Sequence, residues 1–531
     1  MYRSEKALCG LVGRTYRRRQ TAPFAREHSA GNNASGVPVM RHIPHWINGK
    51  AIAPGDHTIE VRDPATDTCV ARVGIADSAT VQQAVTAARN AASAWADLTL
   101  SKRAQVLFRF RDLLLASREE LATLITQEHG KTIDDAAGEV LRAVDSVELA
   151  TGGPALARGG TSLGTGPGID TKSVMHPLGV CVGVTPFNFP VMMGLMMLSV
   201  SLAAGNTFIW KPSEQAPGAA IKIAELFAEA GLPDGVLNVV HGQQEAVNEL
   251  IDHPATQAIS FVGSSAVAQA IYARAAAAGK RVQAFGGAKN HLVVMPDADL
   301  DLVADHLAAA AFGAAGQRCM AISVAVVVGS DQEPLLEKIG KRARETNLNA
   351  GTVPGADLGP VVSRAAQARI RGIVAAAIDD GARAVVDRSH EKVDGAENGY
   401  FVGPTVLADV PVASAAYREE IFGPVLTVLR VDTLDDALEL IREHPYGNGA
   451  SIFTQNGAAA NKFEREASAG MVGVNVAIPV PVAAYAVQGW KSSAFGDTGL
   501  NNASWSFYTR PKYVTSRWDA PAGSDFGFRP N

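Results

Sequence analysis

The sequence predicts an α/β fold built on parallel sheets. Between residues 179 and 278, short runs rich in β-branched residues alternate four times with helical stretches. Repeats of this kind form right-handed βαβ crossovers. A second strand–helix series begins near residue 320. The chain has 531 residues, 47% hydrophobic and 19% charged, which is a soluble globular composition long enough for two or three domains.

The expected elements follow in order along the chain. An Ala-rich stretch at 78–97 has apolar residues at helical spacing, and the helical pattern continues over 101–129. Four strand–helix pairs come next, at 179–185 with 191–204, 207–211 with 216–230, 236–240 with 244–252, and 259–262 with 265–278. The second series has expected strands at 321–329, 381–387, 424–431 and 450–454. The tail at 507–517 is predicted to be an isolated strand, which often pairs elsewhere, including with another subunit.

Composition excludes several classes of function. A net charge of −5 gives no reason to expect nucleic acid or an anionic membrane as a partner. The apolar run at 191–204 has 14 residues, whereas a membrane-spanning helix needs about 20, so we expect a buried helix of a soluble core. The four cysteines show neither zinc-ligand spacing nor a disulfide framework, which favours a reducing compartment and no metal.

Residues 1–39 are left out of the expected fold. They are rich in arginine and show no clear hydrophobic periodicity. A basic start of this kind can be a mitochondrial presequence. The alternative, which we favour, is a disordered extension or an upstream start codon, with ordered sequence from Met40 onward. The expected location is therefore the cytoplasm, or the mitochondrial matrix if the segment is a presequence.

Cys319 is the candidate nucleophile. It lies in the segment FGAAGQRCMA, where small residues precede it and Arg318 is its neighbour. We expect the guanidinium to favour the thiolate, which is the reactive form. A single cysteine beside an arginine is more often inert packing, so the argument depends on other motifs.

Three segments at the ends of predicted strands supply polar groups. TPFNFP offers the side-chain amide of Asn188, which suits an oxyanion. WKPSE places Lys211 and Glu214 where ligands gather in open α/β sheets. SFVGSS puts Ser264 at a helix N-terminus, where backbone amides can meet a pyrophosphate. Each alone is usually only a turn, but together with Cys319 they form a strong joint signal.

These segments resemble the aldehyde dehydrogenase superfamily. The motifs TPFNFP, KPSE, FVGSS, GGAKN, GQRC, EIFGP and YGNGASIF occur in family order, and the resemblance spans roughly residues 45–518. It implies an enzyme in which Cys319 is the nucleophile and Asn188, with the backbone amide of Cys319, forms the oxyanion hole. It implies that NAD is bound by Thr185, Phe187, Lys211, Glu214, Gln215, Ser264, Gly286 and Glu420, with Glu420 on the nicotinamide ribose. Glu214 would repel a 2′-phosphate, which favours NAD over NADP.

The resemblance also implies a fold in three parts. A Rossmann-like NAD-binding domain would comprise 40–159 and 183–312, and an α/β catalytic domain would comprise 313–500. A small β oligomerisation flap would combine 160–182 with 501–518. A homo-oligomer, either a dimer or a tetramer, is therefore expected.

One departure from the superfamily bears on the reaction. The segment FGGAK aligns with ELGGK of hydrolytic members, in which the glutamate activates the water that releases the product. Phe285 occupies that position, and its separation from Cys319 (319 − 285 = 34 residues) is the usual interval. Phenylalanine cannot accept a proton, so hydrolysis of a thioester is expected to be slow. The thiol of coenzyme A needs less help from a base.

In detail the chain resembles the CoA-acylating methylmalonate-semialdehyde (malonate-semialdehyde) dehydrogenases. It shares GAKNH, FGAAGQRCMA, GVN followed by PVP, and GWKSS with them. That branch binds the substrate carboxylate with two arginines, which match Arg142 and Arg318, and guanidinium groups bind carboxylates in bidentate fashion. Without the resemblance, Arg142 is equally well interpreted as an arginine on the surface of a helix. The run VAAYAVQ at 482–488 departs from the branch, which has several phenylalanines there, so a bulkier acidic aldehyde is an alternative substrate.

The expected activity is NAD-dependent oxidation of methylmalonate semialdehyde or malonate semialdehyde, a step of valine catabolism. It would pass through a thioester on Cys319, lose carbon dioxide and yield propionyl-CoA or acetyl-CoA with coenzyme A as co-substrate. One alternative is a hydrolytic aldehyde dehydrogenase for another acidic or bulkier aldehyde. The other is a catalytically silent binding protein, which the intact Cys319, Asn188, Lys211 and Glu420 disfavour.

Overall fold

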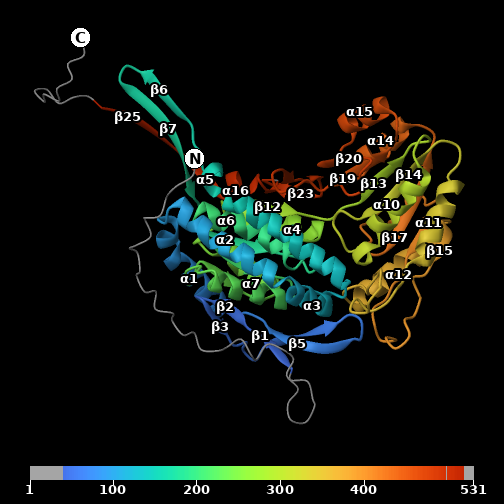
Figure 1. Ribbon diagram of the computed structural model, residues 1–531, viewed down its shortest axis with the longest axis horizontal. Helices are drawn as coiled ribbons and strands as arrows, with labels where there is room; N and C mark the ends of the chain where they lie inside the picture. Colours follow the sequence, from blue (N-terminus) through green and yellow to red (C-terminus); the bar gives the residue numbers. More distant parts are fainter. Residues whose placement is uncertain (1–39, 498, 519–531) are drawn as a thin grey trace, which may run out of the picture. The chain divides into compact units, whose positions relative to one another are not determined.

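A computed structural model describes residues 40–497 and 499–518. The expectations for residues 1–39 lie outside the described residues. Within the described residues, the chain from His42 onward forms one compact unit, and its main parts are two sheets with their helices and a small β flap (Figure 1). No helix of the described residues is long and apolar enough to cross a membrane.

The first sheet has eight strands in the order β23-β12-β11-β8-β9-β10-β2-β3. They are β2 (His45–Ile47), β3 (Lys50–Ile52), β8 (Val180–Val184), β9 (Thr207–Lys211), β10 (Leu237–Val239), β11 (Thr256–Val262), β12 (Arg281–Phe285) and β23 (Ala494–Gly496). The five strands from β12 to β10 are parallel, and the outer strands are antiparallel to their neighbours. The predicted parallel α/β sheet is therefore confirmed.

The strand order reverses beside β8. The chain passes from β8 to β9 and β10 on one side and then returns to β11 on the other side of β8. The loops after β8 and β11 therefore leave the same edge of the sheet next to each other. In open α/β sheets, ligands bind in the crevice at such a switch point.

Helices cover both faces of this sheet. They are α1 (Ser78–Ala96), α2 (Leu100–Ala116), α3 (Arg118–His129), α4 (Ile133–Thr151), α6 (Met192–Ala204), α7 (Gly218–Glu229), α8 (Gln244–Asp252) and α9 (Ser265–Ala277). The run at 191–204 is a buried helix as predicted, because α6 is apolar on nearly every side. The helical pattern predicted over 101–129 forms two helices, and Ser117 ends α2 and begins α3.

The second sheet has seven strands in the order β15-β16-β17-β14-β13-β19-β20. They are β13 (Asn290–Val294), β14 (Ile322–Val328), β15 (Arg383–Asp387), β16 (Thr405–Ala408), β17 (Val425–Val431), β19 (Gly449–Phe453) and β20 (Met471–Val474). The helices are α10 (Leu300–Phe312), α11 (Glu333–Glu345), α12 (Arg364–Asp379), α14 (Leu434–Glu443) and α15 (Gly457–Glu466). The chain changes sheets between β12 and β13, earlier than the expected division at residue 313, because β13 pairs with β14 and β19.

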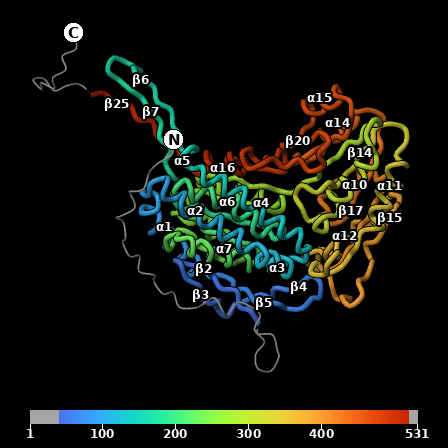
Figure 2. Tube along the Cα trace, in the orientation of Figure 1, coloured from blue at the N-terminus to red at the C-terminus, as the bar shows by residue number. Residues whose placement is uncertain are grey.

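The tail strand pairs within its own chain. β25 (Thr509–Arg517) lies antiparallel to β7 (Ile169–Pro177), which also pairs with β6 (Thr161–Gly166). Figure 2 shows the hairpin and the tail side by side. The other short elements are α5 (Gly153–Leu156), α13 (Ala415–Arg418), α16 (Ser504–Phe507), β18 (Tyr446–Gly447), β21 (Ala486–Val487), β22 (Trp490–Lys491) and β24 (Leu500–Asn501).

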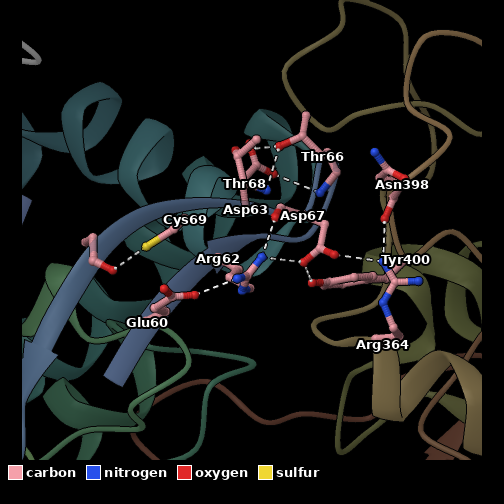
Figure 3. A network of polar contacts seen from close by, with 12 residues as sticks. Glu60, Arg62, Asp63, Thr66, Asp67, Thr68, Cys69, Arg364, Asn398 and Tyr400 are labelled. Carbon is pink, nitrogen blue, oxygen red and sulfur yellow. Dashed lines mark hydrogen bonds and ion pairs between the residues drawn. The ribbon is translucent and has the colours of Figure 1, made fainter. Parts of the chain in front are cut away.

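A polar network joins an N-terminal hairpin to the helices of the second sheet (Figure 3). Asp67 lies in the turn between β4 (Thr58–Asp63) and β5 (Thr68–Gly74), strands that pair in a small sheet with β1 (Arg41–Ile43). Its carboxylate accepts from the Tyr400 hydroxyl, from Arg364 of α12 at 2.8 Å and from Arg62 at 3.0 Å. These donors lower the pKa of Asp67 to about 2.

Candidate active site

Cys319 follows a strained turn. Ala314, Ala315 and Gly316 all have left-handed backbone conformations, with φ of 50°, 55° and 66°. Alanine adopts this region at a cost of about 1–2 kcal/mol. A Cβ at Gly316 would lie 2.1 Å from the carbonyl oxygen of Gly423, so only glycine allows the close approach. The turn therefore brings the segment with Cys319 against the loop that follows Glu420.

Two asparagines fix the backbone of Cys319. The Nδ2 of Asn290 donates to the carbonyl oxygens of Cys319 and Ala321, both at 2.9 Å. The Nδ2 of Asn448 donates to the Cys319 carbonyl at 3.1 Å. Neither residue was predicted from the sequence as part of the site, although both occur in the motifs GGAKN and YGNGASIF. An amide side chain in each motif was the available signal.

The Cys319 thiol is protonated at neutral pH. Burial raises its pKa to about 11, and the Glu420 carboxylate adds to the effect, while the N–H groups of Cys319 and Met320 oppose it. The expectation that Arg318 favours the thiolate is not met. Its guanidinium pairs with Asp135 at 2.5 Å, so that charge is largely neutralised.

Asn188 lies beside the nucleophile segment. It follows β8 at the switch point and is only 4% exposed. Its Nδ2 donates to the carbonyl oxygen of Gln317 at 3.0 Å, two residues before Cys319. The structure therefore brings together the predicted nucleophile segment and the predicted oxyanion donor.

A buried ion pair, which was not predicted from the sequence, supports the Asn188 loop. The side chains of Lys131 and Glu139 are 1% and 0% exposed, and their charged atoms are 2.8 Å apart. Lys131 also donates to the carbonyl oxygen of Asn188 at 2.6 Å. Glu139 accepts from the backbone N–H groups of Val191 and Met192 at 2.8 and 3.1 Å. A charged pair this deeply buried is stable only when hydrogen bonds satisfy both ions.

The predicted nucleotide-binding residues lie at neighbouring strand ends. Thr185, after β8, accepts from the indole N–H of Trp210 at 2.8 Å. Lys211, at the end of β9, pairs with Glu214 at 2.9 Å. Gln215 follows this pair, and its backbone N–H donates to the Ser213 hydroxyl at 3.3 Å.

Ser264 begins α9 directly beyond β11. Its side chain makes no capping hydrogen bond to that helix. The first backbone N–H groups of a helix lack partners within the helix and attract anions. The thirteen-residue α9 thus presents donors at the switch point, beside the loop after β8.

Glu420 shares a small pocket with Cys319 and Arg318. Its carboxylate accepts from the backbone N–H of Ala288 at 2.9 Å, and burial raises its pKa to about 6. The carboxylate is therefore mostly ionised at neutral pH and available to accept hydrogen bonds.

Gly286 and Phe187, two further predicted cofactor-binding residues, each contact a neighbouring segment. A Cβ at Gly286 would meet the Ser265 hydroxyl at 2.5 Å, so glycine is required there. The ring of Phe187 meets the edge of Phe422 at a centroid distance of 5.9 Å.

Two further predicted positions have different surroundings. Phe285 is a buried residue of β12, paired with Val262 and Ala494, and it belongs to the core of the first sheet. Arg142 lies on the exposed side of α4 and pairs with Asp145 at 3.2 Å. The structure shows no contact between Arg142 and Cys319. No group of three or more metal-binding side chains occurs in the part of the chain that is described.

Residues 52–514 match the Aldehyde dehydrogenase family. The chain belongs to this family, as the motifs predicted, and it has the aldehyde dehydrogenase fold. The predicted class of enzyme is therefore confirmed.

Its relatives are more specific. The chain is 48% identical over 494 residues to malonate-semialdehyde dehydrogenase of Pseudomonas aeruginosa, covering 92% of this chain and 99% of that one. It is 45% identical over 488 residues to the acylating, mitochondrial methylmalonate-semialdehyde/malonate-semialdehyde dehydrogenase of Rattus norvegicus, covering 92% and 90%. A solved Sinorhizobium meliloti protein complexed with NAD is 44% identical, with a TM-score of 0.90 over 92% of this chain and 100% of that one.

Proposed function

We propose that this protein is an NAD-dependent, CoA-acylating dehydrogenase of methylmalonate semialdehyde or malonate semialdehyde. It oxidises the aldehyde, loses carbon dioxide and forms propionyl-CoA or acetyl-CoA. The observation that carries the proposal is the pairing of the Cys319 segment with Asn188, while the position of the hydrolytic glutamate is the buried Phe285. The names of the relatives support the same substrates.

The residues at the switch point fit NAD. The open N-terminus of α9 suits its pyrophosphate, and the Lys211–Glu214 pair suits ribose hydroxyls because it offers both a donor and an acceptor. Glu420 is the acceptor for the nicotinamide ribose. The negative charge of Glu214 disfavours the 2′-phosphate of NADP. When bound, NAD accepts a hydride from the carbon that is attached to Cys319.

The first steps use the residues around Cys319. The Cys319 thiol gives its proton to solvent water, and the resulting thiolate adds to the aldehyde carbon while the electron pair of the carbonyl bond moves to the oxygen. Asn188 and the backbone N–H of Cys319 stabilise that oxyanion by donating hydrogen bonds to it. For this, the Nδ2 of Asn188 turns from the Gln317 carbonyl toward the substrate oxygen. When the oxyanion collapses, hydride leaves the carbon and a thioester remains on Cys319.

The acyl group then loses its carboxylate. The bond to the β-carboxylate breaks, carbon dioxide leaves, and the electron pair enters the thioester as an enolate, which takes a proton on carbon. The thiolate of coenzyme A next attacks the thioester carbonyl and expels the Cys319 thiolate. A thiolate is a stronger nucleophile than water, so this step proceeds without a base at Phe285.

Two arginines are assigned to the carboxylate of the substrate. Arg318 lines the pocket with Cys319, and its planar guanidinium has donors beyond those that bind Asp135. Arg142 lies two turns along α4 from Asp135, at the helical spacing that places both on one face. Arg142 reaches the substrate by releasing Asp145, an exposed pair that is weak in water.

The flap suits self-association. β6 and β25 are the two edges of its three-stranded sheet, and edge strands pair readily with other chains. We include a homo-oligomer, either a dimer or a tetramer, in the proposal.

The thioester provides the direct test. The enzyme is mixed with methylmalonate semialdehyde and NAD without coenzyme A, and the reaction is quenched in acid. The mass of the peptide that contains Cys319 is then measured by mass spectrometry. We expect a propionyl adduct on that peptide, and none on Cys319→Ala. Full turnover to a free acid with no adduct would contradict the acylating reaction and favour hydrolysis.

A further inference from the structure

One face of α4 contacts both catalytic segments. Asp135 and Glu139 are four residues apart on this helix, so their side chains project from the same face about 6 Å apart along the axis. Asp135 contacts the segment that carries Cys319, and Glu139 contacts the segment that carries Asn188. These segments lie far apart in the sequence, and a single rigid helix connects them.

Asp135 holds the strained turn before Cys319 at two points. One carboxylate oxygen accepts from the backbone N–H of Ala314 at 3.1 Å, where the left-handed conformation begins. The other accepts from Arg318 at 2.5 Å, directly before the nucleophile. A strained conformation persists only where its surroundings determine it. Asp135 supplies two of those constraints.

Glu139 holds the Asn188 loop in a comparable way. One carboxylate oxygen accepts from the first N–H groups of the α6 region, those of Val191 and Met192. The other pairs with Lys131, which in turn binds the Asn188 carbonyl oxygen. The loop from Asn188 to Met192 is therefore attached to α4 at both of its ends.

We propose that Asp135 and Glu139 are positioning residues that together set the separation between the Cys319 thiol and the Asn188 side-chain amide. This inference rests on the catalytic roles proposed above for Cys319 and Asn188. Neither carboxylate touches the substrate. Their effect is geometric, because misplacement by about 1 Å can slow an enzymatic step about 100-fold.

The two carboxylates make separable predictions. Asp135→Asn removes the charge that holds Arg318, so it disturbs the nucleophile segment. Glu139→Gln leaves that segment intact and disturbs only the oxyanion donor. Glu139→Gln leaves the buried Lys131 ammonium without its counter-charge and can unfold the protein. The double variant Lys131→Met/Glu139→Gln is therefore made as well. Asp134→Asn is the matched control, since Asp134 is an exposed acid in the same first turn.

Two readouts are measured on each folded variant. The rate at which iodoacetamide alkylates Cys319, followed by the mass of its peptide, reports the nucleophile segment and needs no substrate. The pre-steady-state burst of NADH with methylmalonate semialdehyde reports hydride release, which depends on both segments. The melting temperature shows whether the fold is retained.

We expect Asp135→Asn to change the alkylation rate at least about threefold and to slow the burst about tenfold or more. The Glu139 variants should slow the burst by a similar factor but leave the alkylation rate within about twofold of the wild-type rate. The control Asp134→Asn should leave both the burst rate and the alkylation rate within about twofold of the wild type. The inference is overturned if Asp135→Asn leaves alkylation unchanged, or if the Glu139 variants change both readouts in proportion. An undiminished burst in Cys319→Ala would instead contradict the proposed function itself.

Discussion

The side-chain Nδ2 of Asn188 lies 3.0 Å from the carbonyl oxygen of Gln317, and this hydrogen bond joins the first sheet to the segment that carries Cys319. It places an amide donor within two residues of Cys319, the proposed nucleophile. The same donor is free to serve a substrate oxygen once an aldehyde adds to the thiol. In the proposed mechanism, the Asn188 amide therefore exchanges one acceptor, the Gln317 carbonyl, for another, the substrate oxygen.

Replacing Asn188 should slow the chemistry rather than weaken binding. Loss of one oxyanion donor typically lowers kcat by about 100- to 1,000-fold, so we expect Asn188→Ala to lower the NADH burst rate by about that factor with little change in KM. Stopped-flow measurement of NADH formation checks this. A burst rate within about threefold of the wild type would remove Asn188 from the oxyanion hole.

The reactivity of Cys319 should rise with pH. Because the pKa of the thiol is about 11, the thiolate fraction, and with it the rate of iodoacetamide alkylation, should grow about tenfold per pH unit from pH 7 to 10.

Glu420→Gln extends this test. Glu420 is ionised at pH 8, since its pKa is about 6, and its negative charge raises the pKa of the thiol. Removing the charge should lower the pKa of the thiol and speed alkylation at pH 8. Slower or unchanged alkylation would show that Glu420 does not act on the thiol.

The two arginines should govern selectivity for acidic aldehydes. A hydrogen bond to a charged group contributes about 1.5–3 kcal/mol, so Arg318→Gln and Arg142→Gln should each raise KM for methylmalonate semialdehyde about 10- to 100-fold. The KM for propanal, which has no carboxylate, should stay unchanged. In the control Arg111→Gln, on α2, the KM values for both aldehydes should stay unchanged. Equal effects on both aldehydes would mean that the arginines serve the fold.

Asp67 should stabilise the protein in a pH-dependent way. The folded pKa of about 2 lies below the unfolded value of about 3.9, so the stabilisation is complete above pH 4 and is lost as the pH falls toward 2. Asp67→Asn keeps a residue that tolerates the φ of 60° but removes the charge. It should lower the free energy of unfolding by about 1 kcal/mol at pH 7.

Urea unfolding of the wild type and of Asp67→Asn at pH 7 and pH 3 checks this sign. The difference between the two proteins should shrink at the lower pH. A difference that grows toward pH 3 would contradict the assignment of a lowered pKa to Asp67.

The strand–helix repeats could be predicted from the sequence because strands are short runs of β-branched residues and helices have apolar residues at helical spacing. β9 and α8 begin and end at the expected residues, and α6 was anticipated from its uninterrupted apolar run. β13 and β16 were missed. β13 directly follows the GGAK turn, and it is a short apolar run. No helix was predicted after it, so the strand–helix pattern that marked the other strands was lacking. Only its pairing with β14 and β19 shows which sheet it joins.

The site was predictable where side chains act on their own and not where they act through a partner. Cys319 and Asn188 were predicted from the motif that surrounds each one, and their roles remain a proposal. The sequence did not predict a role for Lys131, Asp135 or Glu139, since a charged residue near the start of a helix usually lies on its solvent-exposed face. Their role depends on contacts with residues more than fifty positions away. The effect of Arg318 on the thiol was misjudged because its partner Asp135 is 183 positions away in the sequence.

The dependence on coenzyme A tests the central claim most directly. NADH formation from methylmalonate semialdehyde and malonate semialdehyde is followed with and without coenzyme A, and the products are identified. We predict one rapid turnover per active site without coenzyme A, and sustained turnover with it that releases carbon dioxide and propionyl-CoA or acetyl-CoA. Sustained turnover to a free acid without coenzyme A would contradict the account and identify a hydrolytic aldehyde dehydrogenase.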